Sequence, residues 1–162
     1  MLQYSESEAR RLVVQEARTW LGTPFHVRGR VKGPKGGVDC FTIIACVFHA
    51  LGLCPPWEAE FYQGDWWCHD TQNGYLRTIL KYANKVTTNS NDRRSGNIVL
   101  VGQRTGADKL NVTNWHGGIV TDFPMVVHAF KPRVSEDNML YHPAFQAVGG
   151  LTFFNPFDKE NK

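Results

Sequence analysis

Residues 36–52 read GGVDCFTIIACVFHALG, and the rest of the chain is organised around this segment. Two glycines lead into Asp39 and Cys40, an almost wholly apolar segment follows, and Gly52 closes it. The segment is too short to cross a bilayer and is typical of a helix buried in a protein core. Asp39 is a favoured N-cap residue, and glycine is favoured just beyond a helix C-terminus. We therefore predict a central helix that begins at Cys40.

Cys40 would lie in the first turn of this helix, where free backbone N–H groups and the helix dipole favour a thiolate over a thiol. Such a position suits a nucleophilic cysteine. The alternative is that Cys40 is one more small core residue, because free cysteines are often buried for packing alone.

The composition indicates a globular protein with one core. The chain has 162 residues, of which 42% are hydrophobic and 20% are charged, and we expect a single domain over residues 1–162. The formal net charge is +3 without a long basic run, so no nucleic-acid partner is indicated. The four cysteines do not have the spacing of a structural zinc site, and no metal or other cofactor is expected.

The first residues contain no basic segment followed by an apolar one, as a signal sequence would, and no apolar run is long enough to span a membrane. We expect synthesis in the cytoplasm and no membrane partner. If the protein acts elsewhere, another component must deliver it.

The first half of the chain reads as helices joined by irregular segments. Ser5 and Glu8 form a capping-box pattern, and a helix with Arg10 on its polar face should end before Gly22. A long connection, residues 25–38, precedes the central helix and is expected to be functional. Residues 55–73 carry many aromatic side chains, which would line a groove if exposed or cover the core if buried. A surface helix is predicted over residues 74–86, followed by a loop.

The second half changes to strand periodicity. Strands are predicted at 97–101, 114–120 and 125–130, with a hairpin turn between the last two and a late strand at 147–154. If the turn pairs Val120 with Pro124, His116 lies directly opposite His128 on one face of the hairpin.

Thiol catalysis needs a base within reach of the sulfur and a polar group that orients the base. Cys40, His116 and His128 supply these three roles as nucleophile, base and orienting residue. Histidines that are merely half-buried and satisfied are the alternative for His116 and His128.

The motifs also follow the order seen in NlpC/P60 cysteine peptidases, which the chain resembles over roughly residues 7 to 130. They are residues 36–40 (GGVDC), 95–100 (SGNIVL), 116–120 (HGGIV) and 127–129 (VHA), while residues 20–25 (WLGTPF) resemble the phage-tail-associated branch. The resemblance implies an α+β, papain-like fold in which the nucleophile helix packs on an antiparallel sheet. It implies hydrolysis of bacterial peptidoglycan stem peptides next to a D-γ-glutamyl residue. It also implies action at the cell wall, with delivery as a virion or prophage component and phage tail proteins as partners.

The resemblance assigns Cys40 as nucleophile, His116 as base and His128 as the orienting group. Relatives usually carry tyrosine in place of Phe25, and that phenol is thought to help hold the oxyanion. Without it, we expect substrate or oxyanion contacts from the neighbourhood of Phe25, His26 and Asp39, with the Cys40 backbone N–H as a donor. Three alternatives stay open: a Cys/His amidase or acyltransferase, a catalytically weakened phage-tail structural component, and a metal-binding module.

Overall fold

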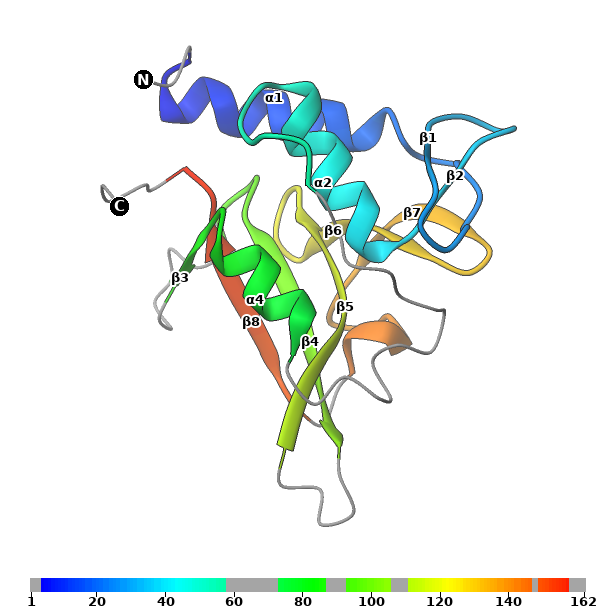
Figure 1. Ribbon diagram of the computed structural model, residues 1–162, viewed down its shortest axis with the longest axis vertical. Helices are drawn as coiled ribbons and strands as arrows, with labels where there is room; N and C mark the ends of the chain where they lie inside the picture. The colour runs from blue at the N-terminus through cyan, green and yellow to red at the C-terminus, as the bar shows by residue number, and fades with distance from the viewer. Residues whose placement is uncertain (1–3, 58–72, 87–92, 106–110, 147–148, 158–162) are drawn as a thin grey trace.

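The computed structural model describes residues 4–57, 73–86, 93–105, 111–146 and 149–157 (Figure 1). The helices are α1 (Glu6–Arg18), α2 (Cys40–Ala50), α4 (Gly74–Leu80) and the short 3-10 helix η1 (Pro143–Phe145). The strands are β1 (Arg30–Val31), β2 (Gly37–Val38), β3 (Asn84–Val86), β4 (Ile98–Thr105), β5 (Asn111–Val120), β6 (Met125–Phe130), β7 (Arg133–Asn138) and β8 (Leu151–Asn155). The predicted α+β class is confirmed. None of the helices in the described ranges has the length and apolar character needed to span a membrane.

Six strands form one sheet in the order β3-β8-β4-β5-β6-β7, and every neighbouring pair is antiparallel. Strands β1 and β2 form a separate hairpin just before α2. Figure 1 shows α1 and α2 close together near one end of the sheet. Helix α2 contacts β5 and β6, the two strands that carry the histidines. The predicted packing of the central helix on an antiparallel sheet is therefore confirmed.

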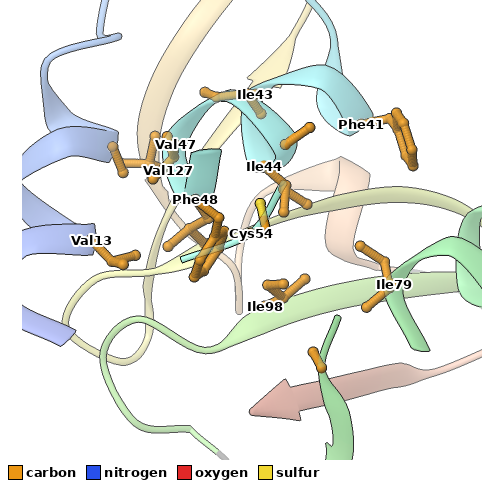
Figure 2. Close-up of a cluster of buried hydrophobic side chains, with 14 of the residues drawn as sticks. Val13, Phe41, Ile43, Ile44, Val47, Phe48, Cys54, Ile79, Ile98 and Val127 are labelled. Atoms are coloured by element: carbon orange, nitrogen blue, oxygen red, sulfur yellow. The ribbon is translucent and has the colours of Figure 1, made fainter. Parts of the chain in front are cut away.

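The sheet buries apolar side chains on both faces. On β4, Ile98 and Leu100 belong to the main core with the helices, whereas Val99 and Val101 belong to a second cluster on the opposite face. Figure 2 shows the main core, in which side chains of α1, α2, α4, β4 and β6 gather. The second cluster includes Phe145 of η1, so the segment after β7 covers the far face. Strand β5 thus runs between two packed layers.

Helix α2 begins at Cys40, as predicted, because Asp39 caps it. The Asp39 carboxylate accepts hydrogen bonds from the backbone N–H groups of Phe41 and Thr42, at 3.0 and 2.8 Å. The Thr42 hydroxyl in turn lies 2.9 Å from the Asp39 backbone nitrogen, which completes a capping box. Beyond the helix, Gly52 has a φ of +66°, the left-handed conformation expected of a glycine there.

Several predicted boundaries were wrong. The helix predicted over 74–86 ends at Leu80, because the chain then turns and pairs as β3 with β8. The first helix ends at Arg18, earlier than a helix closed by Gly22 would end. Its predicted start is confirmed, because the Ser5 hydroxyl accepts from the Glu8 backbone N–H. Strand β7 was not predicted at all.

Most of the aromatic segment lies outside the described residues, namely residues 58–72, which include Cys68. Trp57 is described; it is buried and stacks on Tyr82.

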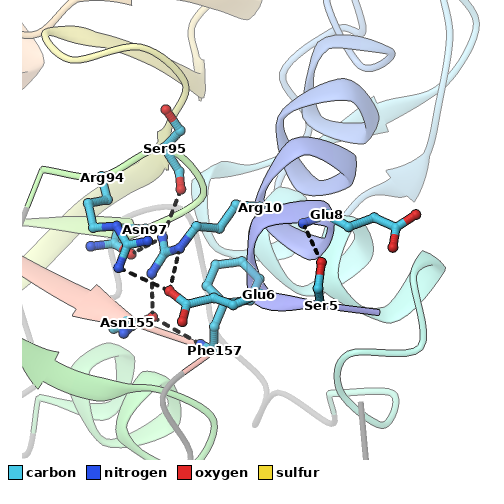
Figure 3. Close-up of polar contacts among 9 residues, drawn as sticks. All are labelled: Ser5, Glu6, Glu8, Arg10, Arg94, Ser95, Asn97, Asn155 and Phe157. Carbon is cyan, nitrogen blue, oxygen red and sulfur yellow. Dashed lines mark hydrogen bonds and ion pairs between the residues drawn. The ribbon is translucent and has the colours of Figure 1, made fainter. Parts of the chain in front are cut away.

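Arg10 was predicted on the polar face of its helix but is buried. Its guanidinium donates to the Asn97 and Asn155 side chains at 2.8 and 2.9 Å and to the Ser95 carbonyl oxygen at 2.8 Å (Figure 3). Glu6, one helical turn earlier, accepts from the same guanidinium at 2.8 Å. Arg10 thereby joins α1 to the start of β4 and the end of β8, and Asn97 has a structural role as one of its partners.

Candidate active site

The loop before α2 is fastened to the start of that helix by Asp39. One carboxylate oxygen, Oδ1, caps the helix, and the other, Oδ2, accepts from the Arg28 backbone N–H at 2.6 Å. The side chain is buried, with 3% of its surface exposed. Asp39 therefore fixes the position of Cys40 at the start of the helix, and a contact of Asp39 with the substrate or the oxyanion stays a prediction.

Cys40 lies against the backbone of β5. Its sulfur is 3.9 Å from the carbonyl oxygen of Trp115, the residue before His116. The hydroxyl of Tyr75 donates to the Cys40 carbonyl oxygen at 2.8 Å. A Cβ at Gly117 would lie 2.7 Å from that hydroxyl, so only glycine leaves room for Tyr75 here. The periodicity of α4 identifies Tyr75 as a core residue but does not reveal its contact with Cys40.

The surroundings of Cys40 do not favour a thiolate. Burial raises the pKa of the thiol above its usual range, and the neighbouring Asp39 carboxylate raises it further. The Tyr75 hydroxyl acts in the opposite direction but is outweighed. The prediction that the helix start alone would make Cys40 a thiolate is therefore wrong for this conformation, because burial and a local negative charge exceed the helix dipole. Cys40 is a neutral thiol at neutral pH.

His116 on β5 and His128 on β6 lie side by side, as predicted. Nε2 of His116 is 2.8 Å from Nδ1 of His128, and the rings are buried, with 1% and 0% exposed. The predicted register is wrong by two residues, since Val120 pairs with Val126 and not with Pro124.

The reason for the register lies in the turn. The Thr121 backbone N–H donates to the Met125 carbonyl oxygen at 3.1 Å, so three residues, 122–124, form the loop between the bonded pair. Because side chains alternate with a period of two, a shift of two residues keeps both histidines on one face. In the observed register His128 lies beside Gly118, and His116 reaches it diagonally.

A third residue follows the histidines. Nε2 of His128 lies 3.0 Å from Oδ2 of Asp137 on β7, and the Ser135 hydroxyl donates to the same oxygen. Sequence reasoning missed Asp137 because β7 is short and polar and has no clear strand periodicity. The described residues thus form a hydrogen-bonded chain from His116 through His128 to Asp137.

Aromatic rings enclose the two histidines. The His116 ring contacts Phe130 and Phe145 edge-on, at centroid distances of 5.4 and 5.3 Å, and the His142 ring lies 4.7 Å from that of His128. Burial lowers the pKa of His116 well below 6.5. Burial also lowers the pKa of His128, to about 4, although the Asp137 carboxylate acts in the opposite direction. Both imidazoles are neutral at pH 7.

The Cys40 sulfur lies beside the backbone of β5 and not against the His116 ring. Gly117 faces Leu100 and Tyr75 in the main core, whereas the His116 ring packs with Phe145 on the other face of the sheet. Among the residues that the structure describes, no hydrogen bond joins the Cys40 sulfur to the His116 ring. The structure therefore brings His116 and His128 together and places Cys40 at the backbone beside them, without direct contact.

Phe25 and His26 lie in the loop that Asp39 fastens to α2. Phe25 is partly buried and its backbone N–H donates to the Pro132 carbonyl oxygen at 2.8 Å. His26 is exposed, with Nδ1 3.0 Å from the Val27 carbonyl oxygen. A role of either residue at the oxyanion stays a prediction.

One group within the described ranges has the composition of a metal site. His128, Asp137 and His142 each offer a ligand atom, and these atoms lie within 4.8 Å of one another. Both nitrogens of His128 already take part in hydrogen bonds, and Nδ1 of His142 accepts from the Ala144 backbone N–H at 3.2 Å. Metal binding would have to replace such bonds, and the expected absence of a metal stays a prediction.

The sequence matches no protein-family model and no curated protein. Solved structures do match. The NlpC/P60 domain of the peptidoglycan hydrolase SagA superposes with a TM-score of 0.56 at 15% identity, covering 88% of this chain and 96% of that one. NlpC1 from Trichomonas vaginalis gives a TM-score of 0.56 at 15% identity, over 96% of this chain and 46% of that one.

A lipoprotein-like member of the NLP/P60 family from Staphylococcus aureus subsp. aureus Mu50 gives a TM-score of 0.58 at 14% identity. It is matched over 96% of this chain and 43% of its own, so this chain spans less than half the length of that protein and of NlpC1. At these identities the likeness concerns the fold. The antiparallel sheet, with Cys40 at the start of the helix packed on it, has the fold of NlpC/P60 domains.

Proposed function

We propose that this protein is a cysteine peptidase that hydrolyses amide bonds in the stem peptides of bacterial peptidoglycan, next to a D-γ-glutamyl residue. The observation that carries the proposal is the position of Cys40. It occupies the first turn of a capped helix and lies 3.9 Å from the strand residue that precedes His116. The similarity to a domain of a peptidoglycan hydrolase supports the choice of substrate.

The mechanism begins from a neutral thiol and a neutral imidazole. The mechanism requires Nδ1 of His116 to reach the Cys40 sulfur while Nε2 of His116 keeps its hydrogen bond to Nδ1 of His128. The thiol proton then passes to His116 while the sulfur attacks the amide carbonyl carbon. His116 returns this proton to the leaving amine as the C–N bond breaks, and water hydrolyses the thioester. The Cys40 backbone N–H, at the first helical position, is available to the oxyanion.

No cofactor takes part in this mechanism. We propose that the protein acts at the cell wall, where this substrate lies. Residues 20–25 support delivery as a virion or prophage component with phage tail proteins as partners, and this part of the proposal rests on the sequence resemblance alone.

Two other functions compete. A Cys/His amidase or acyltransferase would use the same residues on a different acyl substrate. A catalytically weakened structural component of a phage tail is favoured by the raised pKa of Cys40, by the separation of its thiol from His116, and by the missing phenol at Phe25.

The test is mass spectrometry of muropeptides after incubation of purified peptidoglycan with the wild type, with Cys40→Ala and with Cys46→Ala as the matched control. We expect new peptide fragments with the wild type and the control, and none with Cys40→Ala. Turnover of small acyl esters without muropeptide cleavage would favour the acyltransferase. Intact muropeptides and unreacted esters with the wild type would favour the structural component.

A further inference from the structure

Asp137 closes the row of hydrogen bonds that begins at His116. It lies on β7, where Ser135 pairs directly with His128 in the β6–β7 ladder. Asp137 is two residues further on and therefore lies on the same face, which brings Oδ2 within 3.0 Å of Nε2 of His128. The Ser135 hydroxyl donates to that oxygen and holds the carboxylate in place. About a third of the Asp137 side chain is exposed, whereas the His128 ring is fully buried.

The chemistry of these groups fixes where the protons lie. An ionised carboxylate can only accept hydrogen bonds, so the proton between Asp137 and His128 belongs to Nε2 of His128. A neutral imidazole carries one proton, so Nδ1 of His128 is an acceptor. It lies 2.8 Å from Nε2 of His116, which must then be the donor. Neutral His116 also carries one ring proton, and because that proton is on Nε2, Nδ1 of His116 has a free lone pair.

We propose that Asp137 is a positioning residue that sets the tautomers of both histidines and leaves Nδ1 of His116 unprotonated, as the acceptor of the Cys40 proton. The assignment of the tautomers stands on the contacts of Asp137, His128 and His116. The use of Nδ1 on Cys40 rests on the proposed function.

The reverse tautomers show what Asp137 prevents. If Nδ1 of His128 carried the proton, it would donate to Nε2 of His116, and Nδ1 of His116 would then be protonated. That nitrogen could not accept a proton from a thiol. The buried ring of His128 has no other ionised partner at Nε2 among the described residues, so the choice between the two arrangements depends on Asp137.

The first test is nitrogen NMR of the full protein labelled with ¹⁵N-histidine at pH 7.5, because protonated and unprotonated ring nitrogens have distinct shifts. We expect Nε2 protonated and Nδ1 unprotonated in both His116 and His128. Asp137→Asn should shift both rings toward a mixture of tautomers. The matched control is Glu136→Gln, which removes the neighbouring carboxylate on β7; that carboxylate binds Arg18 and Thr121 and not the histidines.

A protonated Nδ1 of His116 in the wild type would overturn the proposal, and so would an Asp137→Asn spectrum identical to that of the wild type. The wild-type spectrum decides the matter even if the variant fails to fold. If equimolar zinc chloride displaces the Nε2 proton of His128, the residues His128, Asp137 and His142 form a metal site instead, and the proposal is overturned.

The second test is turnover of a stem peptide as a function of pH. Asp137→Asn should lower kcat by about tenfold to a thousandfold with little change in KM, as expected when an orienting carboxylate is lost. Asp137→Glu should restore part of the rate, and Glu136→Gln should match the wild type.

The two proposals can fail separately. Predicted tautomers without any peptide turnover would end the proposed function but keep the role of Asp137. Full turnover by a folded Asp137→Asn would end the role of Asp137 but keep the function.

Discussion

One carboxylate oxygen of Asp39 accepts hydrogen bonds from the start of α2, and the other accepts from the Arg28 backbone N–H in the preceding loop. Two substitutions can therefore separate the contributions of the two oxygens. Asp39→Asn keeps a carbonyl oxygen for the cap and places an amide group, a donor, against the Arg28 backbone N–H. The hydrogen bond lost is 2.6 Å long with an ionised acceptor, and such bonds contribute about 1.5–3 kcal/mol. Asp39→Ala also loses the cap, at about 1 kcal/mol more. We expect the free energy of unfolding to fall in the order wild type, Asn, Ala.

Asp39→Asn should lower the stability of the protein but raise the reactivity of the Cys40 thiol. The Asp39 carboxylate raises the pKa of Cys40, so replacing it by a neutral amide should lower that pKa. Asp39→Asn should therefore be less stable than the wild type while its Cys40 reacts faster with iodoacetamide at pH 8. A general loosening of the site would expose other cysteines as well, so Cys46 serves as the internal reference.

Urea unfolding measures the change in the free energy of unfolding, as a shift of the midpoint at constant m. Peptide mapping after brief alkylation measures the reactivity of Cys40 relative to Cys46. Asp122→Asn is the matched control, since Asp122 is exposed in the turn between β5 and β6. Stability of Asp39→Asn equal to that of the wild type would contradict the contribution of the hydrogen bond to Arg28. An unchanged rate of Cys40 alkylation in that variant would contradict the effect of the Asp39 charge on the thiol.

Three further predictions follow from buried polar groups. His128 has a pKa of about 4 in the folded protein against about 6.5 unfolded, so its contribution to stability is complete above pH 6.5 and is lost as the pH falls toward 4, by about 3 kcal/mol. In His128→Gln, the free energy of unfolding measured with urea should depend less steeply on pH across this range. An unchanged pH dependence would contradict the lowered pKa of His128. Tyr75→Phe removes the hydroxyl bound to the Cys40 carbonyl oxygen and should cost about 1–2 kcal/mol, as well as slow the alkylation of Cys40; equal stability and equal reactivity would argue against the contact. Arg10→Lys cannot reproduce the guanidinium contacts to Asn97 and Asn155 and should lower the thermal midpoint, whereas the exposed Arg11→Lys should not; equal midpoints would show that the buried contacts are not stabilising.

The sequence predicted those parts of the site that depend on local pattern. The cap at Asp39 and the start of α2 at Cys40 follow from residue preferences at helix ends, which act over a few neighbours. The shared face of His116 and His128 follows from strand alternation, and it survived an error of two residues in the register because that error is even.

Other features depend on distant partners and left no local signal. The hairpin register was decided by the bond between Thr121 and Met125. Residues 84–86 became a strand because β8 offers an edge to pair with. Asp137 lies on a polar strand without clear periodicity, and its role appears only when β7 is placed beside β6.

The protonation state of the Cys40 thiol also depends on residues that are distant in the sequence. Helix position favours a thiolate at Cys40, and this part could be read from the sequence. Burial by the sheet and the charge of Asp39 act in the opposite direction and are larger, so the sign of the pKa shift was decided by tertiary structure.

The proposed function requires that the Cys40 sulfur attacks the carbonyl carbon of a stem peptide. A peptide aldehyde that ends in D-γ-glutamyl, with ¹³C at the aldehyde carbon, tests it directly by NMR. We predict a tetrahedral hemithioacetal carbon with the wild type and with Cys46→Ala, and its absence with Cys40→Ala. A hemithioacetal signal of equal intensity in Cys40→Ala would contradict attack by this sulfur. The absence of a hemithioacetal signal in a wild type that cleaves peptidoglycan would contradict it as well.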